Sequence, residues 1–208
     1  YWSSDVCSSD LFLALSAGAF AWGFAGEVLR PTLAQWQDFL SLLGLATVWA
    51  GSLGMLVRPQ WRNLIAYSLV AQAGWVLLML ASGGPMSLES EGFFSMAVHS
   101  VALLLVLFGV LVLERNGGTH AEQAVRGLVR TRPPLAFLLI TGLLTMGCLP
   151  PTGGFAARAM LLSRLATDGL SLLAIAAALS TVVMAYPCLI WVYRILEPRS
   201  TPQEWAFP

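Results

Sequence analysis

The sequence predicts an all-α fold, a polytopic bundle of about six transmembrane helices in which one helix is broken. The chain of 208 residues is 57% hydrophobic and 11% charged, whereas about a quarter of the residues in a soluble domain are charged. Five continuous apolar stretches are long enough to cross a hydrocarbon layer about 30 Å thick, which takes roughly 20 residues. A sixth apolar stretch is interrupted by the sequence LPPTGGF at residues 149–155. Together these observations predict a membrane protein with several spans.

The first eleven residues differ in character from the rest of the chain. The string WSSDVCSSDL at residues 2–11 looks like the in-frame translation of a sequencing-library adapter, and it is polar where the following segment is apolar. We therefore expect residues 1–11 to be an artefact. Residues 12–195 are then expected to form one transmembrane domain that is truncated at its N-terminal side, with residues 196–208 as a C-terminal tail.

Each predicted helix is an apolar run bounded by residues that end helices. The first run stops at Arg30-Pro31, the second at Arg58-Pro59 and the third at Gly83-Gly84-Pro85. The fourth ends in the polar segment 114–133, after which the interrupted helix begins. In chain order, we expect helices at 12–28, 37–57, 63–82, 93–113, 134–166 with an interruption, and 170–194.

The arginines predict the orientation of these spans. Eight arginines fall on one side of the alternating loops, whereas only Arg30 and Arg164 fall on the other, so the first side should be cytoplasmic. The longest connection, 114–133, carries apolar residues at helical spacing and is compatible with a short amphipathic helix at the membrane interface. We expect a multi-pass protein of a bacterial cytoplasmic membrane. The eight arginines are Arg58, Arg62, Arg115, Arg126, Arg130, Arg132, Arg194 and Arg199.

The interrupted helix carries the sharpest local signal. Two consecutive prolines lack the N–H that a helix needs, and two consecutive glycines allow backbone angles that other residues avoid. A break at membrane depth must pack in protein or line a hydrated cavity, and broken helices of this kind hold ions in transporters. A tight turn between two shorter helices at the membrane surface remains the alternative. The motif consists of Pro150, Pro151, Thr152, Gly153, Gly154 and Phe155.

Three polar side chains lie within apolar stretches and are candidates for function. Arg158 is expected to face the bundle interior with a carboxylate or carbonyl partner, because a lipid-facing arginine at depth costs at least ~2.5 kcal/mol; snorkelling to an interface is the alternative. His99 is expected either to relay protons or bind water, or to hydrogen-bond a neighbouring helix carbonyl. Gln72 is expected to bridge helices by hydrogen bonds more readily than to conduct protons.

Three ordered motifs resemble one family. LPPTGGFAAR at 149–158 is similar to the GIPPTxGFxxK segment of the proton-conducting membrane subunits of respiratory complex I, a family shared with multisubunit sodium/proton antiporters. RNLIAYSLVAQAGW at 62–75 resembles the family's KRLLAYSSIAHAGY, and HSVALLLVLFG at 99–109 resembles its HAFFKALLFLG. In the AYS…QAG and PPTxGF segments, the chain resembles the N-type subunit of NADH-quinone oxidoreductase most, with the antiporter-type D subunit close behind.

The resemblance implies a function. It implies a membrane subunit that takes part in proton translocation coupled to electron transfer, with other membrane subunits, the lipid bilayer and protons or sodium ions as partners. It implies no cofactor, and the sequence carries no phosphate-binding loop, no cysteine cluster for a metal and no sign of nucleic-acid binding. Three alternatives stay open: a degenerate structural subunit that does not conduct, a cation/proton antiporter subunit, and an unrelated secondary transporter.

The departures from the family pattern restrict the mechanism. The chain has no lysine, and the family's motif lysines correspond here to Arg158, Arg62 and Leu103. Arginine stays protonated in proteins, so its role would be electrostatic and not that of a proton shuttle. We expect His99, Arg158, Gln72 and Arg62 to lie along the proton path, with no catalytic residue and no metal site in the chain.

Overall fold

The computed structural model describes residues 33–57, 60–82, 87–117 and 125–197. These ranges are helical and contain no strand, which confirms the all-α prediction. Of the helices in these ranges, four are long and apolar enough to cross a membrane, at Gln35–Val57, Trp61–Ala81, Gly92–Arg115 and Ser171–Leu196. The described helices are α2 (Leu33–Val57), α3 (Trp61–Ala81), α4 (Ser87–Gly117), α6 (Leu128–Thr131), α7 (Pro133–Met146), α8 (Gly153–Thr167) and α9 (Ser171–Leu196).

The predicted helix bounds agree closely with the structure for most elements. Helix α4 is the main difference, because it begins at Ser87, before the predicted start at residue 93. The predicted helix at 12–28, the proposed artefact at 1–11 and the tail from residue 198 lie outside the described residues.

The connection before α7, for which a short interfacial helix is expected, is described only in part. Only the four-residue α6 forms within its described part, and Val125 and Leu128 are buried in the bundle core. These two apolar side chains therefore anchor the segment to the other helices. They do not form one face of a separate interfacial helix in the described residues.

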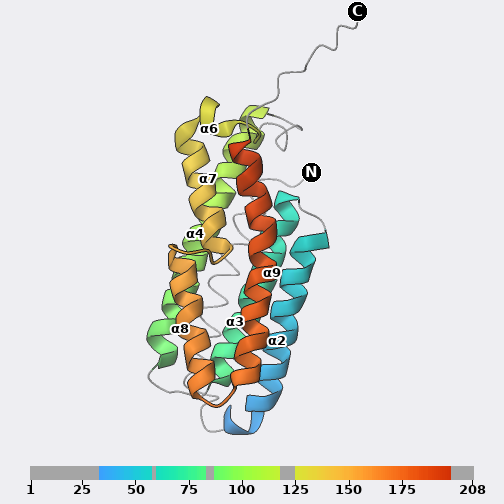
Figure 1. The fold of residues 1–208 in the computed structure, drawn as a ribbon, viewed down its shortest axis with the longest axis vertical. Helices are drawn as coiled ribbons and strands as arrows, with labels where there is room; N and C mark the ends of the chain where they lie inside the picture. The colour runs from blue at the N-terminus through green and yellow to red at the C-terminus, as the bar shows by residue number, and fades with distance from the viewer. Residues whose placement is uncertain (1–32, 58–59, 83–86, 118–124, 198–208) are drawn as a thin grey trace, which may run out of the picture.

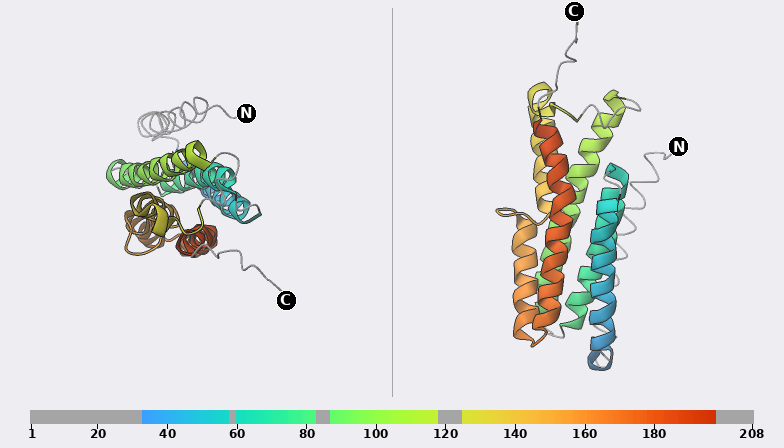
Figure 2. Two further views of the ribbon diagram at one scale, coloured as in Figure 1. Left: turned by 90° about the horizontal axis from the view of Figure 1, so that it is seen from above. Right: turned by 45° about the vertical axis from the view of Figure 1, so that its right-hand side comes forward.

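The helices run along one common long axis (Figure 1). Helix α2 packs along α3 and α9, and α4 packs against both α7 and α8. Helices α7 and α8 follow one another along that axis, so that together they make one broken span beside α9 (Figures 1 and 2). The break between them lies in the middle of the bundle.

Small residues bring α2 and α3 close together. A Cβ atom on Gly51 would lie 2.5 Å from the backbone nitrogen of Ala71, and one on Gly74 would lie 2.6 Å from that of Val48. Helices in membranes associate through such close packing of small residues, because lipid is as apolar as the side chains that contact it. Large apolar side chains such as Leu172, Val182 and Phe108 point outward instead, as expected of lipid-facing positions.

Candidate functional site

The helix break is built from local hydrogen bonds. Helix α7 ends at Met146, and the Gly147 N–H donates to the Leu143 carbonyl at 2.8 Å. The Leu149 N–H donates to the Leu144 carbonyl at 3.0 Å, and the peptide bond between Pro150 and Pro151 is cis. The N–H groups of the turn therefore donate to carbonyl groups at the end of α7 that would otherwise lack a partner where the helix stops.

The position of the break decides between the two interpretations of the motif. A turn at the membrane surface would place α7 and α8 side by side, but they follow one another along the bundle (Figure 1). The surface-turn alternative is therefore wrong. The predicted range of the interruption, residues 149–155, is also partly wrong, because α8 begins at Gly153 and includes Gly154 and Phe155 in its first turn.

The two glycines of the motif meet different surroundings. A Cβ atom on Gly154 would overlap the Thr145 carbonyl oxygen at the end of α7. A Cβ atom on Gly153 would meet only the methyl groups of Val98, at 3.4 and 3.5 Å. The close approach of α8 to the end of α7 thus depends on Gly154.

Arg158 lies in α8 one turn after the break and points into the bundle. Only 4% of the residue is exposed, so the alternative in which it snorkels to an interface is wrong. Its Nη2 donates to Gln72 Oε1 on α3 at 2.7 Å, and its guanidinium carbon lies 4.2 Å from the centroid of the Trp75 ring. The predicted partner of carbonyl type is therefore a side-chain amide. Gln72 bridges two helices, as expected.

His99 lies close to Arg158, on α4. Both residues line a cavity of about 10 Å³, roughly the space that one water molecule needs, together with Ser95 and Cys148. His99 is 8% exposed. In the described part of the chain, five buried side-chain nitrogen atoms have no hydrogen-bond partner, and three of them belong to this site: His99 Nε2, Arg158 Nη1 and Gln72 Nε2.

We refer to Gln72, Trp75, His99, Cys148 and Arg158 as the Arg158 cluster. Among the described residues, no carboxylate pairs with its arginine, so one positive charge is surrounded by an amide, an indole, an imidazole and a thiol. A buried charge without a counter-ion strongly favours an acceptor such as a water oxygen or a carboxylate. The cluster can therefore hold a fixed positive potential beside an imidazole.

The fourth predicted residue of the path lies elsewhere. Arg62 is at the start of α3, its side chain is 69% exposed, and its Nη2 is 3.8 Å from Glu114 Oε1 at the end of α4. The structure thus brings His99, Arg158 and Gln72 together and leaves Arg62 outside the cluster. A surface ion pair of this kind contributes little stability.

Trp75 and Cys148 are members of the cluster that the sequence analysis missed. Trp75 lies three residues after Gln72, so helical spacing alone places both on one face of α3. Cys148 follows Gly147 in the turn, with a left-handed φ of 54°, and nothing in the sequence signals that conformation. No group of three or more His, Cys, Asp or Glu side chains that could hold a metal ion occurs in the ranges that the structure describes.

The chain is similar in sequence to known membrane subunits. Residues 2–184 match the family model described as NADH:quinone oxidoreductase/Mrp antiporter, TM. NADH-quinone oxidoreductase subunit N 2 of Solidesulfovibrio magneticus is 33% identical over 169 residues, which cover 81% of this chain and 36% of the relative. Subunit N of Cupriavidus taiwanensis is 30% identical over 77% of this chain and 34% of its own length. This chain therefore spans about a third of the length of these relatives.

Two solved structures share the fold. A chain of the Mrp complex from Dietzia sp. superposes with a TM-score of 0.74 at 20% identity, covering 89% of this chain and 34% of the other. A chain of respiratory complex I from Thermus thermophilus with bound aureothin superposes with a TM-score of 0.63 at 28% identity, covering 79% of this chain and 38% of the other.

Proposed function

The chain belongs to the NADH:quinone oxidoreductase/Mrp antiporter membrane family, and on that premise we propose that it takes part in proton translocation coupled to electron transfer. It would do so as part of a membrane subunit in an NADH-quinone oxidoreductase type complex, whose other membrane subunits are its partners. Redox chemistry would belong to those partners. The relatives named subunit N support this complex over others.

The buried Arg158 beside the mid-bundle break is the observation that carries this proposal. A cation held at membrane depth is costly, and such residues usually mark ion or proton pathways. Among the described residues, Arg158 also has one guanidinium nitrogen without a hydrogen-bond partner, and the imidazole of His99 in the same cavity has one such nitrogen as well. The cavity that Arg158 and His99 both line has room for about one water molecule, which would supply the missing hydrogen-bond partner.

The proposed roles follow from the chemistry of each side chain. Arg158 stays charged and sets the electrostatic potential, whereas the imidazole of His99 can both accept and donate a proton. Gln72 holds the guanidinium at 2.7 Å and so fixes its orientation. Arg62, which lies at the arginine-rich end of the bundle, would act where the path meets water.

One alternative retains specific support. The chain has no lysine, so the group that would release a proton at mid-membrane in the related subunits is absent from it. A subunit that keeps the fold and helix packing without conducting would show the same buried arginine as a structural tie between α3 and α8.

Proton pumping by Arg158 variants separates these functions. We expect Arg158→Lys to keep most proton pumping in inverted membrane vesicles, because it keeps the charge, and Arg158→Leu to lose most of it. Arg130→Leu, which removes an exposed arginine of α6, is the matched control and should pump normally. Normal pumping by an assembled Arg158→Leu complex would favour the structural subunit.

A further inference from the structure

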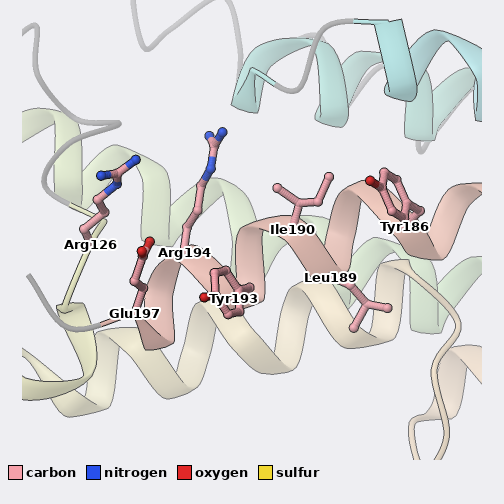
Figure 3. Close-up of a pocket in the computed structure, with 7 residues that line it drawn as sticks. All are labelled: Arg126, Tyr186, Leu189, Ile190, Tyr193, Arg194 and Glu197. Carbon is pink, nitrogen blue, oxygen red and sulfur yellow. The ribbon is translucent and has the colours of Figure 1, made fainter.

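A groove with a charged end and an apolar wall runs along the outer side of α9. It has a volume of about 380 Å³ and lies at the arginine-rich end of the bundle. Figure 3 shows the charged side chains at one end of the groove and Tyr186 at the other. The lining residues are Arg126, Tyr186, Leu189, Ile190, Tyr193, Arg194 and Glu197.

The charged end of the groove is basic. Arg126 and Arg194 contribute two positive charges and Glu197 one negative charge, which leaves a net charge of +1. Arg194 is held in place because its guanidinium carbon lies 4.9 Å from the centroid of the Trp191 ring. Trp191 in turn stacks on Trp61 of α3, with ring centroids 3.9 Å apart. The position of this charge is therefore fixed by the bundle.

The wall of the groove is suited to an acyl chain. Tyr186, Leu189 and Tyr193 lie three, four and seven residues apart on α9, which places them on one helix face. Tyr186 is 60% exposed, Leu189 44% and Tyr193 67%. This face leads from the charged end toward the middle of the span. Tyr193 lies near the end of α9, where tyrosines favour the level of lipid headgroups.

We infer that this groove binds an anionic phospholipid through its phosphodiester headgroup. The two arginines would bind phosphate oxygens, Glu197 would accept a hydrogen bond from a headgroup hydroxyl, and one acyl chain would lie along Tyr186 and Leu189. Basic pockets at the cytoplasmic end of transmembrane helices recognise anionic headgroups in this way, and arginine binds phosphate with two parallel hydrogen bonds. The net positive charge favours an anionic lipid over a zwitterionic one. The inference does not depend on proton translocation.

Lipid titration of the purified protein tests the inference. The full chain, extracted in mild detergent with the subunits that copurify, is titrated with dioleoyl phosphatidylglycerol while bound lipid is counted by native mass spectrometry. We expect Arg126→Gln to weaken binding about fivefold, the fold-change that corresponds to about 1 kcal/mol per basic residue near a membrane surface. Arg126→Lys should restore most of the affinity, and Arg130→Gln, an equal loss of charge outside the groove, should leave it unchanged.

Other probes distinguish the source of the phosphate. Inorganic phosphate should not compete, because it lacks the acyl chain, and phosphatidylcholine or phosphatidylethanolamine should bind more weakly than phosphatidylglycerol. Arg194→Gln is a second variant with the same expected loss, should Arg126→Gln fail to fold. Equal phosphatidylglycerol binding by wild type and both variants would overturn the site. So would phosphatidylethanolamine binding as tight as phosphatidylglycerol, or displacement of the lipid by inorganic phosphate.

Discussion

At the scale of the residue, the planar guanidinium of Arg158 accounts for most of the site geometry. Nη2 donates to Gln72, the guanidinium carbon lies over the Trp75 ring, and Nη1 has no hydrogen-bond partner in the described part of the chain. A lysine ammonium could reproduce the charge but not the planar fork of donors in fixed directions, because it is a compact point charge on a flexible stem. Arg158 is thus suited to hold charge in one fixed position.

Removing the acceptor on Gln72 should destabilise the bundle. Gln72→Leu leaves a buried guanidinium without its hydrogen bond, and hydrogen bonds to charged groups are worth roughly 1.5–3 kcal/mol. We expect a lower temperature of thermal unfolding in detergent. Gln60→Leu, an exposed glutamine directly before α3, is the control and should unfold near the wild-type temperature. Equal unfolding temperatures for wild type and Gln72→Leu would show that the bond contributes nothing.

At the scale of the element, the broken span depends on how closely two helix ends approach. The turn between α7 and α8 closes through the Leu149 N–H and the Thr152 N–H, which donate at 3.0 Å to the Leu144 and Leu149 carbonyls. The first turn of α8 then passes against the last turn of α7 at Gly154. The break is therefore an ordered, hydrogen-bonded part of the fold. It places Arg158 near the middle of the bundle.

The two glycines of the motif offer a matched pair of substitutions. Gly154→Ala should lower stability by about 1–3 kcal/mol, the usual cost of overpacking, because its Cβ atom would overlap the Thr145 carbonyl oxygen. Gly153→Ala should be nearly neutral, since its Cβ atom would make ordinary contact with Val98. Thermal unfolding of both variants checks this order. The reverse order would mean that the two helix ends are arranged differently.

Much of this arrangement was predictable from sequence because run length and helix breakers act locally. Apolar runs set the spans, and Pro150-Pro151 set the interruption. The start of the break at Gly147 was not predictable, because it depends on the conformation of Cys148, which the sequence does not signal. The contact between Arg158 and Trp75 depends on how α3 and α8 face each other across the bundle. Local sequence patterns do not show which faces of two helices distant in sequence pack together.

At the scale of the whole molecule, six of the eight described arginines gather at one end of the bundle. They lie at the start of α3, the end of α4, in and around α6 and at the end of α9 (Figure 1), and they are Arg62, Arg115, Arg126, Arg130, Arg132 and Arg194. Such a bias sets the orientation of membrane proteins. This end is also where the proposed lipid groove lies, so one charge distribution would serve both orientation and lipid binding.

Cysteine labelling tests the orientation. Ser87 and Gly117 begin and end α4, so they lie on opposite sides of the membrane in any transmembrane placement of this helix. We expect Ser87→Cys to react with a membrane-impermeant maleimide added outside intact cells, and Gly117→Cys to react only after the membrane is opened. Labelling in the opposite order would reverse the assignment.

The number of protons pumped per NADH oxidised by the double variant His99→Ala/Arg158→Leu tests the central claim most directly. The ratio is measured in inverted vesicles, with assembly of the complex checked on native gels and the double variant His99→Gln/Arg158→Lys as the conservative comparison. If the Arg158 cluster belongs to the proton path, the ratio should fall in the first double variant while the complex still assembles. An unchanged ratio in an assembled complex would contradict the account and assign this chain a structural role.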